Sequence, residues 1–396
     1  MQTLSAKPLR ILAHVYAYQK ASREMSGGIL HYSSTHPGIQ IRFYGPGTPW
    51  SHIDEFAKWE PDGIIIGGSD SRTVSAIENI GCRAAVFINT DGPEKCGLRH
   101  ASIYCDNQAI AEAAANLFTK KKLKHFAYVG TRARDAWSIE RGESFRRFAQ
   151  SEQSTFTSFD LPPTRTKNHN KELSDLALWL RGLPKPCGVF AACDARAKDV
   201  LDAAAEAGIA IPGQLLVCGV DDEEFICRQT SPSLTSIIPD FPSGGYLAAE
   251  QLVTLLSGNE RRLPRRRFGV KGIVERLSTC DANGANQAVL RAQEFIREHA
   301  LSDISVEDVA KAAGASLRLL QKNFKAFTGG TVCGAIQSHR LSQVCDLLRE
   351  TTTPIGQIGE LCGFGDEKHL KKIFRKRFGC TMRDFRATPS SAIHTP

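Results

Sequence analysis

The 396-residue sequence contains neither a membrane span nor a metal-binding cysteine pattern. No run approaches the roughly 18 apolar residues that cross a bilayer. The short apolar run at 11–16 is not followed by a small-residue cleavage site, so we expect no signal peptide. The 12 cysteines include no C-x-x-C pair and no Cys/His grouping at zinc spacing. We therefore expect a cytoplasmic chain with reduced cysteines, no metal site and no membrane contact.

Phosphate-binding loops are absent as well. Neither G-x-G-x-x-G nor G-x-x-x-x-G-K-[ST] occurs, and these are the loops whose glycines let the backbone approach a nucleotide. No matched acid and base, and no set of metal ligands, marks an active site in the sequence. We therefore expect no cofactor and no enzymatic activity.

Positive charge is concentrated in the last third of the chain. The formal net charge is +8, of which residues 286–396 contribute +5, residues 259–285 contribute +4 and the first 258 residues −1. This asymmetry predicts a polyanion as partner of the C-terminal part and a neutral partner for the rest. For the five arginines at 261–267 the alternatives are contact with phosphate and a solvated loop before a strand, of which we favour the loop.

Short β-branched runs alternate with amphipathic segments over the first 240 residues. This alternation predicts parallel sheets in an α/β architecture. In such sheets ligands bind outside the carboxyl ends of the strands, which here are followed by turns at 67–70, 89–92 and 219–222. The expected strands are 11–16, 39–44, 63–66, 85–88, 126–129, 188–192 and 215–220, and the expected helices are 107–121, 140–150, 171–181, 195–207 and 246–256.

The pattern changes after residue 278, where a stretch of turn residues reads as a linker. Beyond it the pattern is helical, with no strand signal. The sequence therefore predicts an α/β domain at 1–278, a linker at 279–285, an all-helical domain at 286–388 and a flexible tail at 389–396.

The helical domain contains a helix, a glycine turn and a second helix. Ser305 and Asp308 predict a capping box, Gly314 permits the tight turn, and Ser316 can cap the second helix. On that second helix one side is apolar and another is basic and amide-bearing, which predicts a helix-turn-helix unit. The apolar side carries Leu317, Leu320, Phe324 and Phe327, and the other carries Arg318, Gln321, Lys322 and Lys325.

The same pattern recurs about 49 residues later. Gly363 stands where Gly314 stood, and Gly379 ends the following helix as Gly329 ended the first. A long helix at 332–348 is expected to connect the two units. Two units in tandem predict a DNA-binding domain. In the second one, Leu370, Ile373 and Phe374 point inward and Lys368, Lys371, Lys372, Arg375 and Lys376 point outward.

These last ~100 residues resemble the DNA-binding domain of AraC/XylS-type regulators. The resemblance rests on A-x-x-x-G-x-S at 310–316, F-K-x-x-x-G at 324–329, G-F at 363–364 and F-[KR]-x-x-F-G at 374–379. It implies that the second helix of each unit reads bases in successive major grooves. The second unit departs from the family pattern at two positions: Lys368 stands where the family has a small polar residue, and Leu370 where it has a phenylalanine. Two alternatives therefore remain for this unit, which either reads bases or holds only phosphate. The implied contacts are Arg318, Gln321, Lys322, Glu367, Lys368, Lys371 and Lys372.

The first 278 residues resemble the periplasmic-binding-protein-like sensor of LacI/GalR regulators. The resemblance rests on D-N at 106–107, R-G-E-S-F at 141–145, C-D-A-R-A at 193–197, G-V-D-D at 219–222 and P-S-L-T at 232–235. It implies a two-lobed α/β sensor, with the chain crossing between lobes near 100–108 and 235–242. Such a sensor before an AraC-type tail is similar to regulators of xylose operons, which also carry D-A-R-A and W-x-x-E-R runs.

The candidate ligand residues have the chemistry of a sugar site. Carboxylates accept hydroxyl protons, arginine offers a rigid donor fork, and tryptophan covers a C–H face of the ring. For Asp106 and Asp194 the alternative is a helix cap, and for Trp137 it is buried packing. The candidates are Asp106, Trp137, Arg141, Asp194 and Asp221.

The sequence thus predicts a sugar-responsive, sequence-specific DNA-binding transcription regulator. By resemblance we expect an activator of a pentose (xylose-like) operon that binds a double-stranded operator as a homodimer, with RNA polymerase as a further partner. One alternative is the solute-binding protein of a sugar uptake system, which needs export and has no use for a basic helical tail. The other is a sugar-metabolising enzyme, for which the sequence offers no catalytic constellation.

Overall fold

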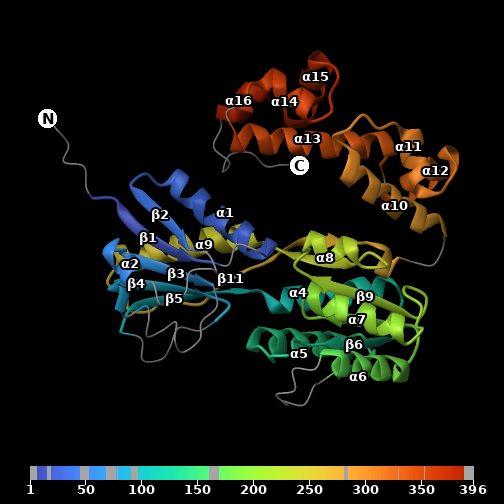
Figure 1. Ribbon diagram of the computed structural model, residues 1–396, viewed down its shortest axis with the longest axis horizontal. Helices are drawn as coiled ribbons and strands as arrows, with labels where there is room; N and C mark the ends of the chain where they lie inside the picture. Colours follow the sequence, from blue (N-terminus) through green and yellow to red (C-terminus); the bar gives the residue numbers. More distant parts are fainter. Residues whose placement is uncertain are drawn as a thin grey trace. The chain divides into compact units, whose positions relative to one another are not determined.

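The computed structural model divides the chain into two compact units, Met1–Thr279 and Cys280–Pro396 (Figure 1). It describes residues 7–15, 19–44, 53–67, 77, 79–90, 97–159, 169–280, 284–328, 330–351 and 353–387. Parts of the predicted turns at 67–70 and 89–92, residues 281–283 of the linker and the tail at 389–396 lie outside this range, as does Gly329.

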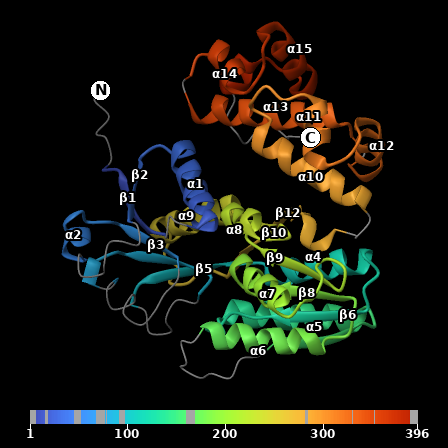
Figure 2. The same ribbon diagram turned by 45° about the vertical axis from the view of Figure 1, so that its right-hand side comes forward.

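Two six-stranded sheets build the first unit, one in each lobe (Figures 1 and 2). The sheet of the first lobe has the order β11-β5-β4-β3-β1-β2, and all its neighbours run parallel. Its strands are β1 (Leu9–His14), β2 (Ile39–Tyr44), β3 (Gly63–Gly67), β4 (Ala84–Ile88), β5 (Arg99–Cys105) and β11 (Arg266–Phe268). Its helices include α1 (Lys20–Thr35), α2 (Ile53–Lys58) and α9 (Phe241–Ser257).

The sheet of the second lobe has the order β12-β10-β9-β8-β6-β7, in which the edge strand β12 runs antiparallel to β10. Its strands are β6 (His125–Val129), β7 (Thr155–Phe159), β8 (Cys187–Ala191), β9 (Leu215–Val220), β10 (Thr235–Pro239) and β12 (Val270–Val274). Its helices are α4 (Asn107–Lys120), α5 (Ala136–Ser151), α6 (His169–Gly182), α7 (Asp194–Glu206), α8 (Glu224–Gln229) and the short η2 (Leu277–Thr279). The two-lobed α/β fold predicted from the sequence is confirmed.

The chain passes between the lobes three times, and the three segments are hydrogen-bonded side by side. Two crossings were expected: β5 to α4 at Asp106, and β10 to α9 at Asp240. The third, at Gly269 between β11 and β12, was not. The Asp106 amide donates to the Phe268 carbonyl, and the Asp240 amide donates to the Gly269 carbonyl, both at 2.9 Å. These bonds make the crossings one hinge.

Apolar strands buried between helices form the cores of both lobes. All five residues of β4 and all six of β9 are buried, as expected for parallel strands covered on both faces. In the first lobe α1 and α9 cross closely. A Cβ atom at Gly28 would lie 2.0 Å from the Pro242 carbonyl oxygen, and one at Gly245 would lie 1.9 Å from that of Met25. Glycine is therefore required at both positions.

The second unit is helical throughout its described residues, as predicted. The capping box of Ser305 and Asp308 is present, and Gly314, Gly363 and Gly379 adopt φ values of 65°, 76° and 72°. These left-handed conformations favour glycine and end one helix before the next begins. The helices are α10 (Gly284–His299), α11 (Val306–Ala313), α12 (Leu317–Thr328), α13 (Val332–Glu350), α14 (Ile355–Leu361), α15 (Glu367–Phe378) and α16 (Met382–Ala387).

Each helix-turn-helix unit has its own apolar core, and α13 contributes to both. Leu320 and Phe324 of α12 pack in the first core, and Leu370 and Phe374 of α15 pack in the second. The predicted connecting helix at 332–348 is α13, which runs two residues further. Helix α10 begins at Gly284, inside the stretch that was expected to be linker.

Candidate ligand cleft and nucleic-acid interface

A cavity of about 840 Å³ lies at the carboxyl ends of the first-lobe strands. Its lining comes from both lobes: Asn89 and Tyr104 from the first, Trp137 and Glu140 from α5 of the second. This is the edge at which parallel sheets bind ligands. Arginines of the 261–267 run also reach it, because β11 begins at Arg266, inside the run that was expected to be a solvated loop. Two of them, Arg265 and Arg267, line the cavity.

Arg141 is buried beside this cavity, with 3% of its surface exposed. Its Nε and Nη2 atoms donate to Asn107 Oδ1 at 3.2 and 3.0 Å, and its Nη1 donates to the Ala192 carbonyl. The guanidinium carbon lies 4.9 Å from the centre of the Trp137 ring, a cation–π distance. The structure thus brings together two residues that the sequence nominated separately.

A chain of hydrogen bonds ties Arg141 to the other lobe. Asn107 Nδ2 donates to Glu140 Oε2 at 2.7 Å, and Glu140 Oε1 accepts from Arg267 Nη2 at 2.9 Å. Sequence reasoning did not select Asn107, Glu140 or Arg267 as site residues. Asn107 and Glu140 belong to the D-N and W-x-x-E-R motifs, and these motifs were the signal by which they could have been found. Arg267 belongs to the arginine run that was expected to form a solvated loop.

Asp221 follows β9 directly. It lies close enough to Arg141 for the two charges to interact. Its φ of 105° is one that aspartate adopts more readily than most residues. Burial raises the pKa of Asp221 from 3.8 to about 7, against the lowering effect of Arg141 and Lys20, while Glu223 raises it further. Among the described residues its carboxylate accepts no hydrogen bond. Asp221 is not itself among the residues that line the cavity.

Asp194 is buried, and both of its carboxylate oxygens accept hydrogen bonds. Oδ1 accepts from Ser236 Oγ at 2.6 Å, and Oδ2 accepts from the Glu223 amide at 2.7 Å and from Cys227 Sγ at 3.3 Å. Burial, and then the charge of Asp221, raise the pKa of Asp194 well above its usual value. This aspartate joins α7, α8 and β10.

Asp106 is placed as a helix cap, the alternative considered from the sequence. Its Oδ1 accepts from the Ala109 amide at 3.0 Å at the start of α4. Of the five nominated residues, the structure therefore places Trp137 at the cavity, with Arg141 against its ring and Asp221 within electrostatic reach of Arg141. It assigns protein partners to the Asp106 and Asp194 carboxylates.

The N-terminus of α1, in the first lobe, is held by acidic residues of the second. Lys20 Nζ donates to Asp222 Oδ2 at 2.6 Å, and the Lys20 amide donates to Glu223 Oε2 at 2.6 Å. Asp222 also accepts from Arg276 Nη2 at 2.6 Å. Burial opposes ionisation of Asp222, but Arg276 and Lys20 outweigh it and lower its pKa. Sequence reasoning missed this inter-lobe clamp, because it joins residues about 200 positions apart.

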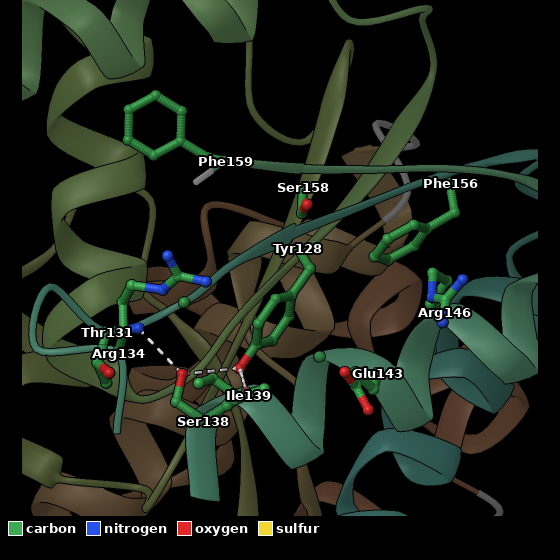
Figure 3. Close-up of a pocket in the computed structure, with 12 residues that line it drawn as sticks. Tyr128, Thr131, Arg134, Ser138, Ile139, Glu143, Arg146, Phe156, Ser158 and Phe159 are labelled. Atoms are coloured by element: carbon green, nitrogen blue, oxygen red, sulfur yellow. Dashed lines mark hydrogen bonds between the residues drawn. The ribbon is translucent and has the colours of Figure 1, made fainter. Parts of the chain in front are cut away.

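A smaller pocket of about 220 Å³ lies within the second lobe, between α5 and strands β6 and β7 (Figure 3). Tyr128 Oη donates to the Ser138 carbonyl at 2.7 Å, and Ser138 Oγ accepts from the Thr131 amide at 3.0 Å. None of the five nominated residues lines it. Of the five, only Trp137 lines the larger cavity between the lobes.

The first predicted reading helix, α12, presents its nominated residues to solvent. Arg318, Gln321 and Lys322 are all exposed, whereas Leu320 and Phe324 are buried. The buried apolar residues and the exposed polar residues lie on opposite sides of α12, which leaves a basic and amide-bearing face for a polyanion.

The second, α15, is exposed in the same way at Glu367, Lys368, Lys371 and Lys372. Lys371 Nζ lies 2.7 Å from Glu367 Oε1 in an ion pair across one turn. Asp366 Oδ1 accepts from the Lys368 amide at 2.9 Å and begins the helix. Glu367 thus neutralises part of the positive charge of this face.

Within the described ranges, no helix is long and apolar enough to cross a membrane. The described residues also include no group of three or more His, Cys, Asp or Glu side chains placed to hold a metal ion.

Comparison with known families defines the class of protein. Residues 115–279 match the model of the periplasmic binding protein-like domain, and residues 309–388 match that of the helix-turn-helix domain. With the two-lobed fold and the paired helix-turn-helix units, these matches identify a DNA-binding transcription regulator with a periplasmic-binding-protein-like sensor and an AraC-type tail. The resemblance predicted from the sequence is confirmed.

The similarity to individual relatives extends over most of the chain. The chain is similar to the xylose operon regulatory protein of Escherichia coli (strain K12), with 28% identity over 348 residues, or 87% of this chain and 88% of that one. The protein of the same name from Haemophilus influenzae is 28% identical over 337 residues, or 85% and 87%. The solved structure of the xylose-binding transcription activator xylR matches with a TM-score of 0.60 and 26% identity, covering 97% of this chain and 99% of that chain.

Proposed function

We propose that this protein is a sugar-responsive transcription activator that binds a pentose, xylose or a close analogue, in the inter-lobe cleft. The observation that carries the proposal is the Arg141 guanidinium over the ring of Trp137, which lines the inter-lobe cavity, with Asp221 within electrostatic reach of Arg141. The full-length similarity to proteins named for the xylose operon supports the choice of pentose.

The cleft residues divide into ligand contacts and supports. Asp221 accepts two sugar hydroxyl protons, Arg141 donates to ring or hydroxyl oxygens, and Trp137 covers an apolar ring face. Asp106 caps α4 and Asp194 orients the loop that carries Asp221, so both act as positioning residues rather than as contacts. The site has no catalytic role, in keeping with relatives that are regulators.

The C-terminal unit binds operator DNA in the cytoplasm. Arg318, Gln321 and Lys322 read bases, while Lys371 and Lys372 hold phosphate. A homodimer places four such helices on a paired site, and the activator acts through contact with RNA polymerase. Bases are distinguished in the major groove by hydrogen bonds, whereas phosphate contacts position the protein.

Sugar controls DNA binding through closure of the two lobes. A ligand shifts an equilibrium only if it binds two global states differently. The inter-lobe bonds of Lys20 with Asp222 and of Arg267 with Glu140 define one of those states. A sugar held by Arg141 and Asp221 of the second lobe also contacts Asn89 and Tyr104, which line the cavity from the first lobe, and so stabilises the state in which the lobes are bridged.

The test is a titration of the purified chain with duplex DNA from upstream of its own operon, in buffers with and without xylose, arabinose, ribose and glucose. We expect one pentose to tighten or relocate binding and glucose to have no effect. An Arg318→Ala, Lys371→Ala double variant serves as the DNA-binding control. Absence of DNA binding at low salt would contradict the proposal. DNA binding that none of the sugars changes would contradict the part of the proposal that makes the first unit a sugar sensor.

A further inference from the structure

One large apolar side chain is exposed on the basic face of α12. Leu319 has 49% of its surface exposed, and its neighbours on the helix are the exposed Arg318 and Lys322. The core of this unit is supplied by Leu320 and Phe324, which are fully buried. Leu319 therefore does not contribute to that core, and burying it against a partner removes apolar surface from water.

The two reading helices can be superposed residue by residue, and they differ at this position. Leu320 and Phe324 of α12 correspond to Leu370 and Phe374 of α15, since each pair is buried at the same spacing. Leu319 then corresponds to His369. The second helix presents a polar side chain at this point of its exposed face, and the first presents an apolar one.

The position of Leu319 along the helix is one from which side chains reach base edges. It is the third residue of α12, and its amide donates to Ser316 Oγ at 3.4 Å in the first turn. Residues in the N-terminal part of a reading helix contact base edges in the major groove. There the 5-methyl group of thymine is the apolar feature that a side chain can contact.

We propose that Leu319 is a specificity-determining residue that packs against the 5-methyl group of a thymine in the half-site bound by the first helix-turn-helix unit. Arg318 and Lys322 on either side also contact the DNA, so that Leu319 is buried on binding. The second unit makes no such contact, because His369 occupies the matching position. This inference rests on the proposed binding of operator DNA by α12.

The experiment uses the full-length chain and the operator defined by footprinting on its own upstream DNA. Each thymine of the operator is replaced in turn by uracil, which removes the methyl group alone. At one thymine in the half-site of the first unit, we expect the wild type to bind about three- to fivefold more weakly, the loss that corresponds to one buried methyl group. Uracil substitutions in the other half-site should have less than a twofold effect.

The variant Leu319→Ala should bind the thymine and uracil forms of that site equally. Leu319→Met, which keeps an apolar side chain of similar size, should retain the preference and shows that the helix is intact. Leu361→Ala removes another exposed leucine, 58% exposed on α14, and should keep the full preference. This control separates a specific contact from a general loss of apolar surface.

Two results would overturn the inference. Undiminished sensitivity to uracil in Leu319→Ala, or no sensitivity at any thymine in the wild type, shows that Leu319 reads no methyl group while the proposed function stands. Failure of the wild-type chain to bind its upstream DNA at all rejects the proposed function, and the inference with it.

Discussion

Two neighbouring aspartates at the end of β9 should respond in opposite ways to loss of their charge. Burial raises the pKa of Asp221 to about 7, so that the fold disfavours its ionised form. The pKa of Asp222 is lowered, because Arg276 and Lys20 outweigh the effect of burial. Asparagine adopts the positive φ values of both positions as aspartate does, so each substitution changes charge with little backbone strain.

The expected magnitude for Asp221→Asn follows from its pKa. The rise from 3.8 to about 7 spans about three pH units, and each unit corresponds to about 1.36 kcal/mol. At pH 8 the substitution should therefore raise the free energy of unfolding by about 2–4 kcal/mol. The folded protein binds the proton more tightly than the unfolded chain, so this advantage shrinks as the pH falls from about 7 and is gone below about pH 4.

Sugar binding by Asp221→Asn should change in the other direction. Loss of hydrogen bonds to a charged acceptor costs about 1.5–3 kcal/mol, which corresponds to roughly ten- to hundredfold weaker affinity. For Asp222→Asn we expect a free energy of unfolding lower by about 3 kcal/mol, because Arg276, only 2% exposed, loses its buried partner.

Urea unfolding followed by tryptophan fluorescence measures these changes, since all four tryptophans lie in the first unit. The measurement is made on the full-length chain at pH 8, pH 6 and pH 4, and calorimetry gives the sugar affinity. Equal destabilisation by both variants at pH 8, or a stabilising effect of Asp221→Asn that does not vary with pH, would refute the electrostatic account of this pair.

Three further predictions concern the two binding faces. Sugar affinity measured by calorimetry should rise between pH 5.5 and pH 8, because the ionised Asp221 is the acceptor, and Asp221→Asn should abolish that rise; the same slope in both proteins would disprove it. Arg141→Lys, which keeps the charge but loses the donor fork, should weaken sugar binding about tenfold or more and leave DNA affinity in the absence of sugar unchanged; wild-type sugar affinity would exclude Arg141 from the site. In fluorescence anisotropy, Lys371→Ala should weaken binding to all DNA sequences alike, whereas Arg318→Ala should cost about 1–3 kcal/mol on the true operator alone; the reverse pattern would exchange their roles.

Local chemistry accounts for what could be predicted from the sequence of the helical unit. The capping box at Ser305 and the turns at Gly314 and Gly363 depend on residues within one or two turns of helix. Glycine at these turns and a hydroxyl at the cap are strong signals, because few other residues satisfy the same backbone. The α/β alternation was readable for the same reason, since buried parallel strands are continuous apolar runs.

The remaining strands were missed because polar residues interrupt them. Strand β5 contains arginine, histidine and serine, and β11 consists largely of arginine. Their backbones are fixed by neighbours in the sheet rather than by apolar content. Pairing with β5 turns part of an apparently solvated run into a strand that carries Arg267 to the cleft.

Long-range contacts decide which candidate carboxylates have hydrogen-bond partners within the protein, and the sequence does not reveal these contacts. Asp194 is directed to Ser236 and Glu223, and a Cβ atom at Gly219 would lie 2.2 Å from its Oδ1. Asp221, only two residues beyond that glycine, has no such partner. Equally plausible aspartates in the sequence therefore have different roles in the fold.

The central claim is that sugar and operator are coupled through one chain, and the most direct test is a pair of calorimetric sugar titrations. One uses the protein alone, and the other uses the protein saturated with its paired operator. Coupling is reciprocal, so a sugar that strengthens operator binding by 1–3 kcal/mol, a typical magnitude, must itself bind about 5- to 150-fold more tightly to the complex. We expect a difference of this size between the two titrations. Identical sugar affinity in the two titrations would contradict it.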